Sequence, residues 1–434
     1  MRFRSTTALV CALLFAFTAS AQKNDSATPK QRISLIRSLG NKGPQAIPVI
    51  ERYLRDPDSQ VRVEAVKAIV KLDTPASLTP LIEATRDQDP EIQIRATDGL
   101  VNEYLPGYVV TAGLTGSWTR GMRQVKAFFK SRNNQTVSPQ TKIRPDVAEA
   151  LVHLIEASSD DDVQANAARA AGILRARAAV PALEQALHST DSETITEALV
   201  ALQKIGDRDA GPSVSFLALD LDPNVQDLAL QTIGILRTKS SAPQVRTALN
   251  STNKEKTRRS ALNALAILGL SADRPVFLKY ERSSDPVLRV AALEGLGRIR
   301  EPKDVPVLQA AYNEKNAHPL VHLAAAFALV DEGDVSHSEF APLTYLIENL
   351  NQSGRADTAK AYLIELCRRE DVRKGVFAAI PQASKDQKIA LCSIFAAVHA
   401  RDSVPVLESL SHNMDPDVSF AATKALQFVK AHSA

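Results

Sequence analysis

The side chains most often used in catalysis and metal binding are few in this sequence of 434 residues, which has eight histidines and three cysteines. His318 and His322 are four positions apart, a spacing that brings two imidazoles to one side of a helix, where they can bind a metal ion together. A third ligand would have to be His337 or Glu339, and no spacing in the sequence fixes either of them near the pair. Two histidines at the start of a repeat more often cap a helix or lie at the surface. We therefore predict no metal site, with His318 and His322 as the candidates for one.

Sequence signatures of enzymes are absent. The chain has no Gly-x-Ser-x-Gly, no glycine-rich phosphate loop and no His-Glu-x-x-His. The cysteines form no Cys-x-x-Cys, so redox exchange and Cys-based zinc sites have no support. Cys367 and Cys392 are 25 residues apart, and the sequence leaves open whether they are bonded. We expect no cofactor, and the missing motifs point away from an enzyme.

The segment from Tyr104 to Pro145 is basic and differs in composition from the rest of the chain. It has seven Lys and Arg residues, no Asp or Glu, four glycines and the only tryptophan. On a helix its apolar side chains would share one face, and such an amphipathic segment suits an anionic membrane surface or an acidic groove of a partner. It can also pack along the rest of the protein with its charges in water, or remain without fixed structure. The candidate docking residues are Trp118, Arg120, Met122, Arg123, Lys126, Phe129 and Lys130.

A helical pattern that recurs along the chain must position all of these residues. In the stretch 285–299, counted from Leu288, small or apolar residues occupy positions +3, +4, +7, +8 and +11, the stripe of an amphipathic helix. Asp285 can cap this helix, and Pro286 suits its first turn. The same register starts again at Val61, Val163, Thr194, Val225, Thr257, Val321 and Val418. Starts from 163 to 321 are 31 to 33 residues apart, and only the gap from 61 to 163 is too long, which indicates an insertion.

Each striped helix follows another helix with a Pro-x-Leu-like pattern, such as Val305-Pro306-Val307-Leu308. One pair of helices is too small to bury its own apolar faces, whereas a stack of pairs buries a continuous core. We therefore predict an all-α fold, an α-solenoid (superhelix) of about eleven stacked antiparallel helix pairs.

The string Asp-Pro-x-x-Arg-x-x-Ala-Ala-x-x-x-Leu-Gly at 285–297 and its weaker copies resemble HEAT repeats, most closely the short HEAT-like repeats of phycobilin lyases. The resemblance covers about residues 30–103 and 145–430, and it implies a fold without one activity, because the family includes scaffolds, inhibitors and a few enzymes. It also implies that a polar residue one position after each start pairs with the Asp of a neighbouring helix start and stiffens the stack; the alternative is an anion-binding stripe. These inter-repeat ladder residues are Arg62, Gln164, Gln226, Arg258 and Arg289.

The N-terminus has the form of a signal peptide. Met1 to Arg4 is basic, Ala8 to Phe17 is an apolar run too short to span a bilayer, and Ala19-Ser20-Ala21 is a small-x-small cleavage site. We predict an exported protein, periplasmic or secreted, after cleavage near Ala21. The expected organisation is a signal peptide at 1–21, a polar leader at 22–29, repeats at 30–103, the insertion at 104–145, and repeats at 146–434 continuous with the first block.

The net charge of +3 gives no indication of a nucleic-acid partner. We predict a non-enzymatic scaffold that binds a protein partner with the surface of the solenoid. Two alternatives stay open. One is a HEAT-like enzyme, either bilin lyase-like or a metal-dependent oxidoreductase. The other is a peripheral membrane protein that docks on an anionic membrane surface through residues 104–145.

Overall fold

The computed structural model describes residues 27–109 and 135–431. Within these residues every regular element is an α-helix or a 3₁₀ helix, and none of these helices is long and apolar enough to cross a membrane. The predicted signal peptide and the predicted docking residues from Trp118 to Lys130 lie outside the described residues. The chain divides into two compact units, residues 1–214 and 215–434.

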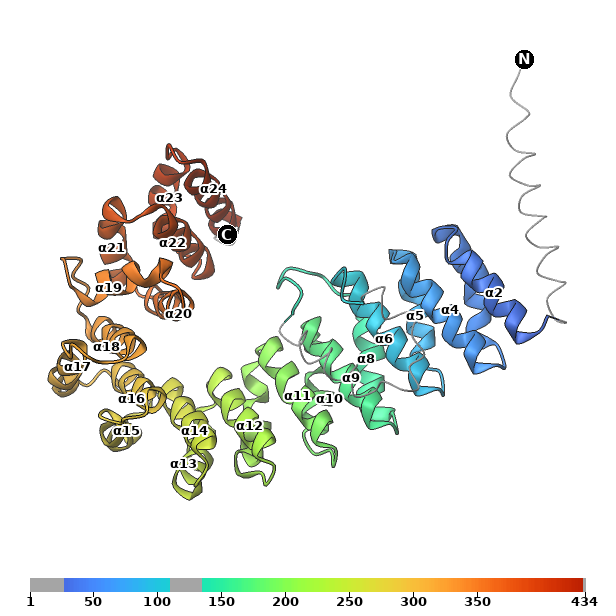
Figure 1. The fold of residues 1–434 in the computed structure, drawn as a ribbon, viewed down its shortest axis with the longest axis horizontal. Helices are drawn as coiled ribbons and strands as arrows, with labels where there is room; N and C mark the ends of the chain where they lie inside the picture. Colours follow the sequence, from blue (N-terminus) through green and yellow to red (C-terminus); the bar gives the residue numbers. More distant parts are fainter. Residues whose placement is uncertain (1–26, 110–134, 432–434) are drawn as a thin grey trace, which may run out of the picture. The chain divides into compact units, whose positions relative to one another are not determined.

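The first unit has a leading helix followed by four helix pairs (Figure 1). The second helices of the pairs form a row, because α4, α6, α9 and α11 each contact the next one. Helix α6 contacts α9 directly although residues 105–144 intervene, so the third pair stacks on the second. The helices are α2 (Pro29–Leu39), α3 (Ile47–Glu51), α4 (Ser59–Leu72), α5 (Leu78–Ala84), α6 (Pro90–Tyr104), α8 (Pro145–Ala157), α9 (Asp161–Ile173), α10 (Val180–Ala186) and α11 (Ser192–Ile205).

The second unit repeats this arrangement, with α12, α14, α16, α18, α20, α22 and α24 in contact one after another (Figure 1). With the 3₁₀ helix η8 (Arg208–Leu219) as the partner of α12, the described residues contain eleven helix pairs, which confirms the predicted α-solenoid. The helices are α12 (Pro223–Ile235), α13 (Ala242–Ser251), α14 (Glu255–Leu268), α15 (Arg274–Tyr280), α16 (Pro286–Ile299), α17 (Val305–Tyr312), α18 (Pro319–Glu332), α19 (Pro342–Glu348), α20 (Ala356–Leu366), α21 (Glu370–Ala379), α22 (Lys385–Ala397), α23 (Val404–Ser411) and α24 (Pro416–Ala431). Short 3₁₀ helices precede or extend several of them: η2 (Pro44–Ala46), η3 (Arg52–Arg55), η4 (Pro75–Ser77), η7 (Arg177–Ala179), η9 (Lys239–Ser241), η10 (Ser271–Asp273), η11 (Pro302–Asp304), η12 (Asn349–Asn351), η13 (Ile380–Gln382) and η14 (Arg401–Ser403).

The second helices begin and end at matching positions of the repeat. Asp58 and Asp285 act as N-caps, accepting the backbone N–H of Gln60 and of Val287, each at 2.9 Å. At the other end, Gly269 adopts a left-handed conformation with φ of 59° and stops α14, because a residue without Cβ tolerates it.

Small residues set the distance between consecutive second helices. A Cβ added at Gly172 of α9 would lie 2.6 Å from Cα of Ala201 in α11, and one added at Gly297 of α16 would lie 2.6 Å from Cα of Ala328 in α18. Both glycines occupy position +9 of their repeat and both alanines position +7 of the next. Position +7 of the sequence stripe therefore lies at the contact between neighbouring pairs.

The fifth pair departs from the predicted alternation of two α-helices. Its first member is η8, which is 3₁₀ over twelve residues. Pro212 lies inside this segment and has no backbone N–H, so an α-helix through it would lose a hydrogen bond and meet a steric clash. Apart from this segment and the third pair, in which α8 and α9 each have 13 residues, each pair has a short first helix and a longer second helix.

Candidate functional site

The predicted ladder residues fasten the two helices of a pair to each other. Nε2 of Gln164 donates to the carbonyl oxygen of Ser158 at 2.8 Å, and Nε2 of Gln226 donates to that of Ala218 at 3.1 Å. Nη2 of Arg258 donates to the carbonyl of Thr252 at 3.3 Å. Each acceptor lies at or just after the end of the first helix, so these side chains satisfy carbonyls that the helix end leaves free.

Two of the five ladder residues also reach the next pair. Arg62 donates to the carbonyl of Asp56 at 2.9 Å and forms an ion pair with Asp87 at 2.7 Å. Arg289 likewise donates to the carbonyl of Glu281 at 2.8 Å and pairs with Glu314. The row is therefore made mainly of hydrogen bonds within a pair, and of its five members Arg62 and Arg289 also form an ion pair with the next pair.

The histidines considered as metal ligands have structural contacts. His318 is the N-cap of α18, where its Nδ1 accepts the backbone N–H of Leu320 at 3.2 Å. His322 lies one position after the start at Val321, and its Nε2 is 2.6 Å from the carbonyl oxygen of Glu314. His322 thus contacts a carbonyl just after the end of the first helix of its pair, as the ladder residues do. Among the residues that the structure describes, no group of three His, Cys, Asp or Glu side chains is placed to hold a metal ion.

The two cysteines in the described repeats are free thiols. Both are buried, Cys367 at the end of α20 and Cys392 in α22. Burial raises the pKa of Cys367 to about 12 and that of Cys392 to about 11. Neither is a thiolate at neutral pH, so neither is suited to act as a nucleophile.

An aromatic cluster surrounds the loop between α18 and α19. Phe340 is 81% exposed and adopts a left-handed backbone with φ of 66°. The hydroxyl of Tyr312 donates to the carbonyl oxygen of Phe340 at 2.9 Å, and the Tyr312 and Tyr345 rings meet edge to face at 5.8 Å. Burial, more than the nearby Tyr345, raises the pKa of Tyr312 to about 12, so this hydroxyl keeps its proton and remains a donor.

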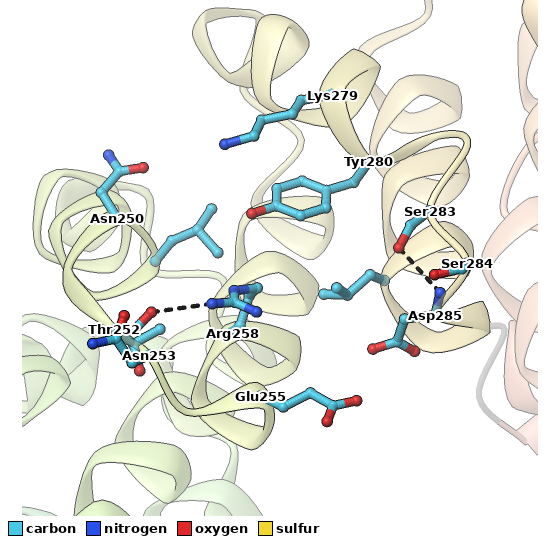
Figure 2. A pocket seen from close by; sticks show the side chains of 12 residues that line it. Asn250, Thr252, Asn253, Glu255, Arg258, Lys279, Tyr280, Ser283, Ser284 and Asp285 are labelled. Atoms are coloured by element: carbon cyan, nitrogen blue, oxygen red, sulfur yellow. Dashed lines mark hydrogen bonds between the residues drawn. The ribbon is translucent and has the colours of Figure 1, made fainter.

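A polar hollow of about 560 Å³ lies where α13 and α15 end and α14 and α16 begin. Figure 2 shows the amine of Lys279, the hydroxyl of Tyr280 and the amide of Asn250 facing the same space, with Arg258 beside it. Lys279 Nζ lies 5.5 Å from the centre of the Tyr280 ring, a cation–π contact. The lining also includes neutral hydroxyl and amide groups, so it can both attract an anion and donate hydrogen bonds to it.

The two carboxylates that line the hollow, Glu255 and Asp285, form ion pairs with an arginine outside its lining. Arg259 forms ion pairs with Glu255 and, at 2.8 Å, with Asp285. Burial alone would raise the pKa of Asp285. The hydrogen bonds that its carboxylate accepts from Arg259 and from the backbone N–H of Val287 have a larger combined effect, and they hold the pKa below its usual value. Within the described ranges, neither Arg258 nor Lys279 forms an ion pair.

Sequence reasoning had selected Arg258 but missed Lys279 and Tyr280. These two come from the end of α15, about twenty residues further on, and no short motif joins them to Arg258. A charge count would have found the region: residues 249–289 contain eight Lys and Arg but four Asp and Glu, a net charge of +4. This stretch, which spans parts of two neighbouring pairs, is therefore basic in a chain whose total net charge is +3.

A second polar cluster is buried at the opposite ends of the second helices. Arg298 donates to Glu365 from Nε and Nη2, each at 3.1 Å, and to Glu294 from Nη1 at 2.9 Å. The hydroxyl of Tyr362 donates to Glu294, and the Arg298 guanidinium lies 4.8 Å from the centre of the Phe327 ring. Burial raises the pKa of Glu365, but Arg298 outweighs it and the pKa is lowered. With each charge met by a partner, the cluster is built to hold α16, α18 and α20 together.

Residues 20–101 and 148–220 match the family model for HEAT repeats. These two segments of the chain are therefore HEAT repeats. An engineered protein of known crystal structure aligns with 88% of this chain and 98% of its own at 18% identity and a TM-score of 0.39. The complex of CpcE and CpcF of phycocyanin lyase, from a Nostoc species, aligns with 67% of this chain and 94% of its own at 18% identity and a TM-score of 0.34. No curated protein matches the sequence.

Proposed function

We propose that this HEAT-repeat protein is an exported, non-enzymatic scaffold that binds a protein partner. A solenoid offers an extended surface, and each pair can present its own loops to a partner. The form of residues 1–21 supports export, since a basic start, a short apolar run and a small-x-small site are typical of a signal peptide.

The observation that carries the binding role is the exposed Phe340. A large aromatic side chain in a left-handed conformation is strained by roughly 1–2 kcal/mol, and such strain is found mostly at functional positions. The Tyr312 hydroxyl fixes the backbone of Phe340, so the ring is presented to solvent from a rigid base. Rigid exposed aromatic rings are frequent anchors at protein–protein interfaces, because they bury a large area with little loss of side-chain entropy.

Crosslinked affinity capture from native cell envelopes, followed by an affinity measurement with the partner it identifies, tests this proposal. Phe340→Gly removes the ring and also suits the left-handed backbone, so a loss of binding cannot be attributed to a strained fold. We expect it to weaken binding at least tenfold. Met414→Ser is the matched control, since Met414 is fully exposed but has no such backbone strain. Equal binding by wild type and Phe340→Gly would refute the role given to Phe340.

A further inference from the structure

We propose that the hollow at Arg258 and Lys279 binds a carboxylate-bearing acidic segment of the partner protein. This inference rests on the proposed scaffold function and adds the chemistry of what the scaffold holds. It depends on three features: two cations without a carboxylate partner in the described part of the chain, neutral donors beside them, and a basic stretch of sequence around them.

Arg258 is placed to bind a carboxylate. One of its nitrogens, Nη2, is directed to the carbonyl of Thr252 at 3.3 Å, and the described part of the chain gives the guanidinium no other hydrogen bond. A guanidinium can present two parallel N–H groups to a carboxylate, and such a charge-assisted pair is stronger than a neutral hydrogen bond. The single hydrogen bond to the Thr252 carbonyl restrains the Arg258 side chain but leaves its positive charge without a counter-charge among the described residues.

Lys279 adds a second positive charge from the neighbouring pair. Its amine lies near the Tyr280 ring, and both groups face the same space as the Asn250 amide (Figure 2). Glu255 and Asp285 do not cancel this charge, because Arg259 pairs with both of them. A carboxylate entering the hollow would meet Arg258 from one pair and Lys279 from the next.

The neutral groups favour a peptide over a phosphate polymer or a lipid surface. Asn250, Asn253, Ser283 and Ser284 line the hollow with amide and hydroxyl groups, which can bond to peptide N–H and C=O groups. A nucleic acid or membrane would need a longer cationic stripe that neutralises several phosphates. A hollow of about 560 Å³ is also within the size range of pockets for compact ligands.

The test is fluorescence anisotropy of the full chain with a labelled hexaglutamate peptide at low salt, with hexaglutamine as the neutral peptide. Arg258→Gln is a conservative variant, because Gln164 and Gln226 make the same tie to the first helix at this position. We expect Arg258→Gln and Lys279→Gln each to weaken hexaglutamate binding about fivefold, an effect typical of one exposed charge contact. Arg282→Gln, which removes an exposed charge paired with Glu281, should change binding less than twofold.

Several outcomes would overturn the inference. Hexaglutamate binding that is no tighter than hexaglutamine binding shows that the hollow does not select carboxylates. An equal loss in Arg282→Gln shows binding to general positive charge. Anionic vesicles or inorganic phosphate that bind through Arg258 and Lys279 while hexaglutamate does not would assign the hollow to phosphate groups instead.

The partner separates this inference from the scaffold proposal. If the captured partner binds the Arg258→Gln and Lys279→Gln double variant as tightly as wild type, the acidic-segment inference is wrong and the scaffold stands. If wild type captures no specific partner, the scaffold proposal fails, and the hexaglutamate measurement alone decides whether the hollow selects carboxylates.

Discussion

Replacing Arg298 by methionine should destabilise the packing of α16, α18 and α20. Arg298 is 11% exposed and is the one side chain that hydrogen-bonds to both Glu294 and Glu365 in the described structure. Methionine keeps much of the apolar stem, which packs near the Phe327 ring, but removes the charge. The variant therefore isolates the electrostatic role of the guanidinium.

The cost follows from the burial of the two carboxylates. Removing one partner of a buried ion pair typically costs about 3–5 kcal/mol, because the remaining charge stays desolvated. Glu365 retains a contact with Arg237 at 3.3 Å, so we expect the lower part of this range, about 3 kcal/mol at pH 7. In wild type the lowered pKa of Glu365 contributes stability above its unfolded pKa, and this is lost as pH falls. In the variant, burial without Arg298 would raise the pKa of Glu365, so the difference from wild type should shrink towards pH 5.

Hydrogen exchange of the full chain, followed by mass spectrometry, measures the result, because it gives a free energy of opening for each helix of a repeat protein. Peptides from α16, α18 and α20 should lose protection, and those from α4 and α6 should not. Arg282→Met, at an exposed ion pair, is the control and should change little. A loss below about 1 kcal/mol in α16 and α20, or an equal loss at pH 5 and pH 7, would refute the role assigned to the cluster.

Three further predictions concern the described helices. Gly297→Ala should cost about 1–3 kcal/mol in the hydrogen-exchange stability of α16, because the added Cβ meets backbone, and Gly234→Ala, with its nearest atom 3.3 Å away, should cost less. Cys367 and Cys392 should resist iodoacetamide at pH 8 in the folded protein and react in urea; fast labelling without urea would contradict their burial. Burial lowers the pKa of Lys204 from 10.5 to about 8. Between pH 8 and 10.5, Lys204 is therefore protonated in the unfolded chain and largely neutral in the folded chain, so the free energy of unfolding should rise with pH in this window. Urea unfolding should show a smaller rise in Lys204→Met.

The sequence was sufficient for the repeat but not for every helix. Position +7 recurs as a small residue because consecutive second helices touch there, as the close approach of Ala328 to Gly297 shows, so the period reflects the packing itself. The same period could not foresee η8, where Pro212 prevents an α-helix, because the first helices have no strong stripe.

The candidate site was less predictable for a geometrical reason. Arg258 was recognisable from its repeat position, but the hollow needs Lys279 and Tyr280 from the following pair. Which polar residues of two pairs face one space depends on the turn between the helices, and periodicity does not encode it. The exposure and left-handed backbone of Phe340 could not be predicted from the sequence either, because this residue lies in a loop outside the repeat pattern.

The Glu365 contacts show how the row in the second unit is curved. Packed helices lie about 8–10 Å apart, so a straight row would put α12 and α20, four steps apart, roughly 30–40 Å from each other. Arg237, just after α12, nevertheless contacts Glu365 of α20 at 3.3 Å, and Arg298 of α16 contacts the same carboxylate. The row must therefore bend towards the face that carries these three side chains.

This curvature makes a last prediction that separates two ways of binding a partner. The hollow is at the start of α16 and Arg298 is near its end, about 20 Å away along a helix of this length. If the partner enters the curved face, the Glu365 ion pairs oppose it, and Glu365→Gln should tighten binding. If the partner uses the hollow, Glu365→Gln should leave its affinity within twofold of wild type, although the protection of α16, α18 and α20 in hydrogen exchange should fall. We expect the second result, because the charges on the curved face are already paired with each other, whereas Arg258 and Lys279 form no ion pair in the described structure.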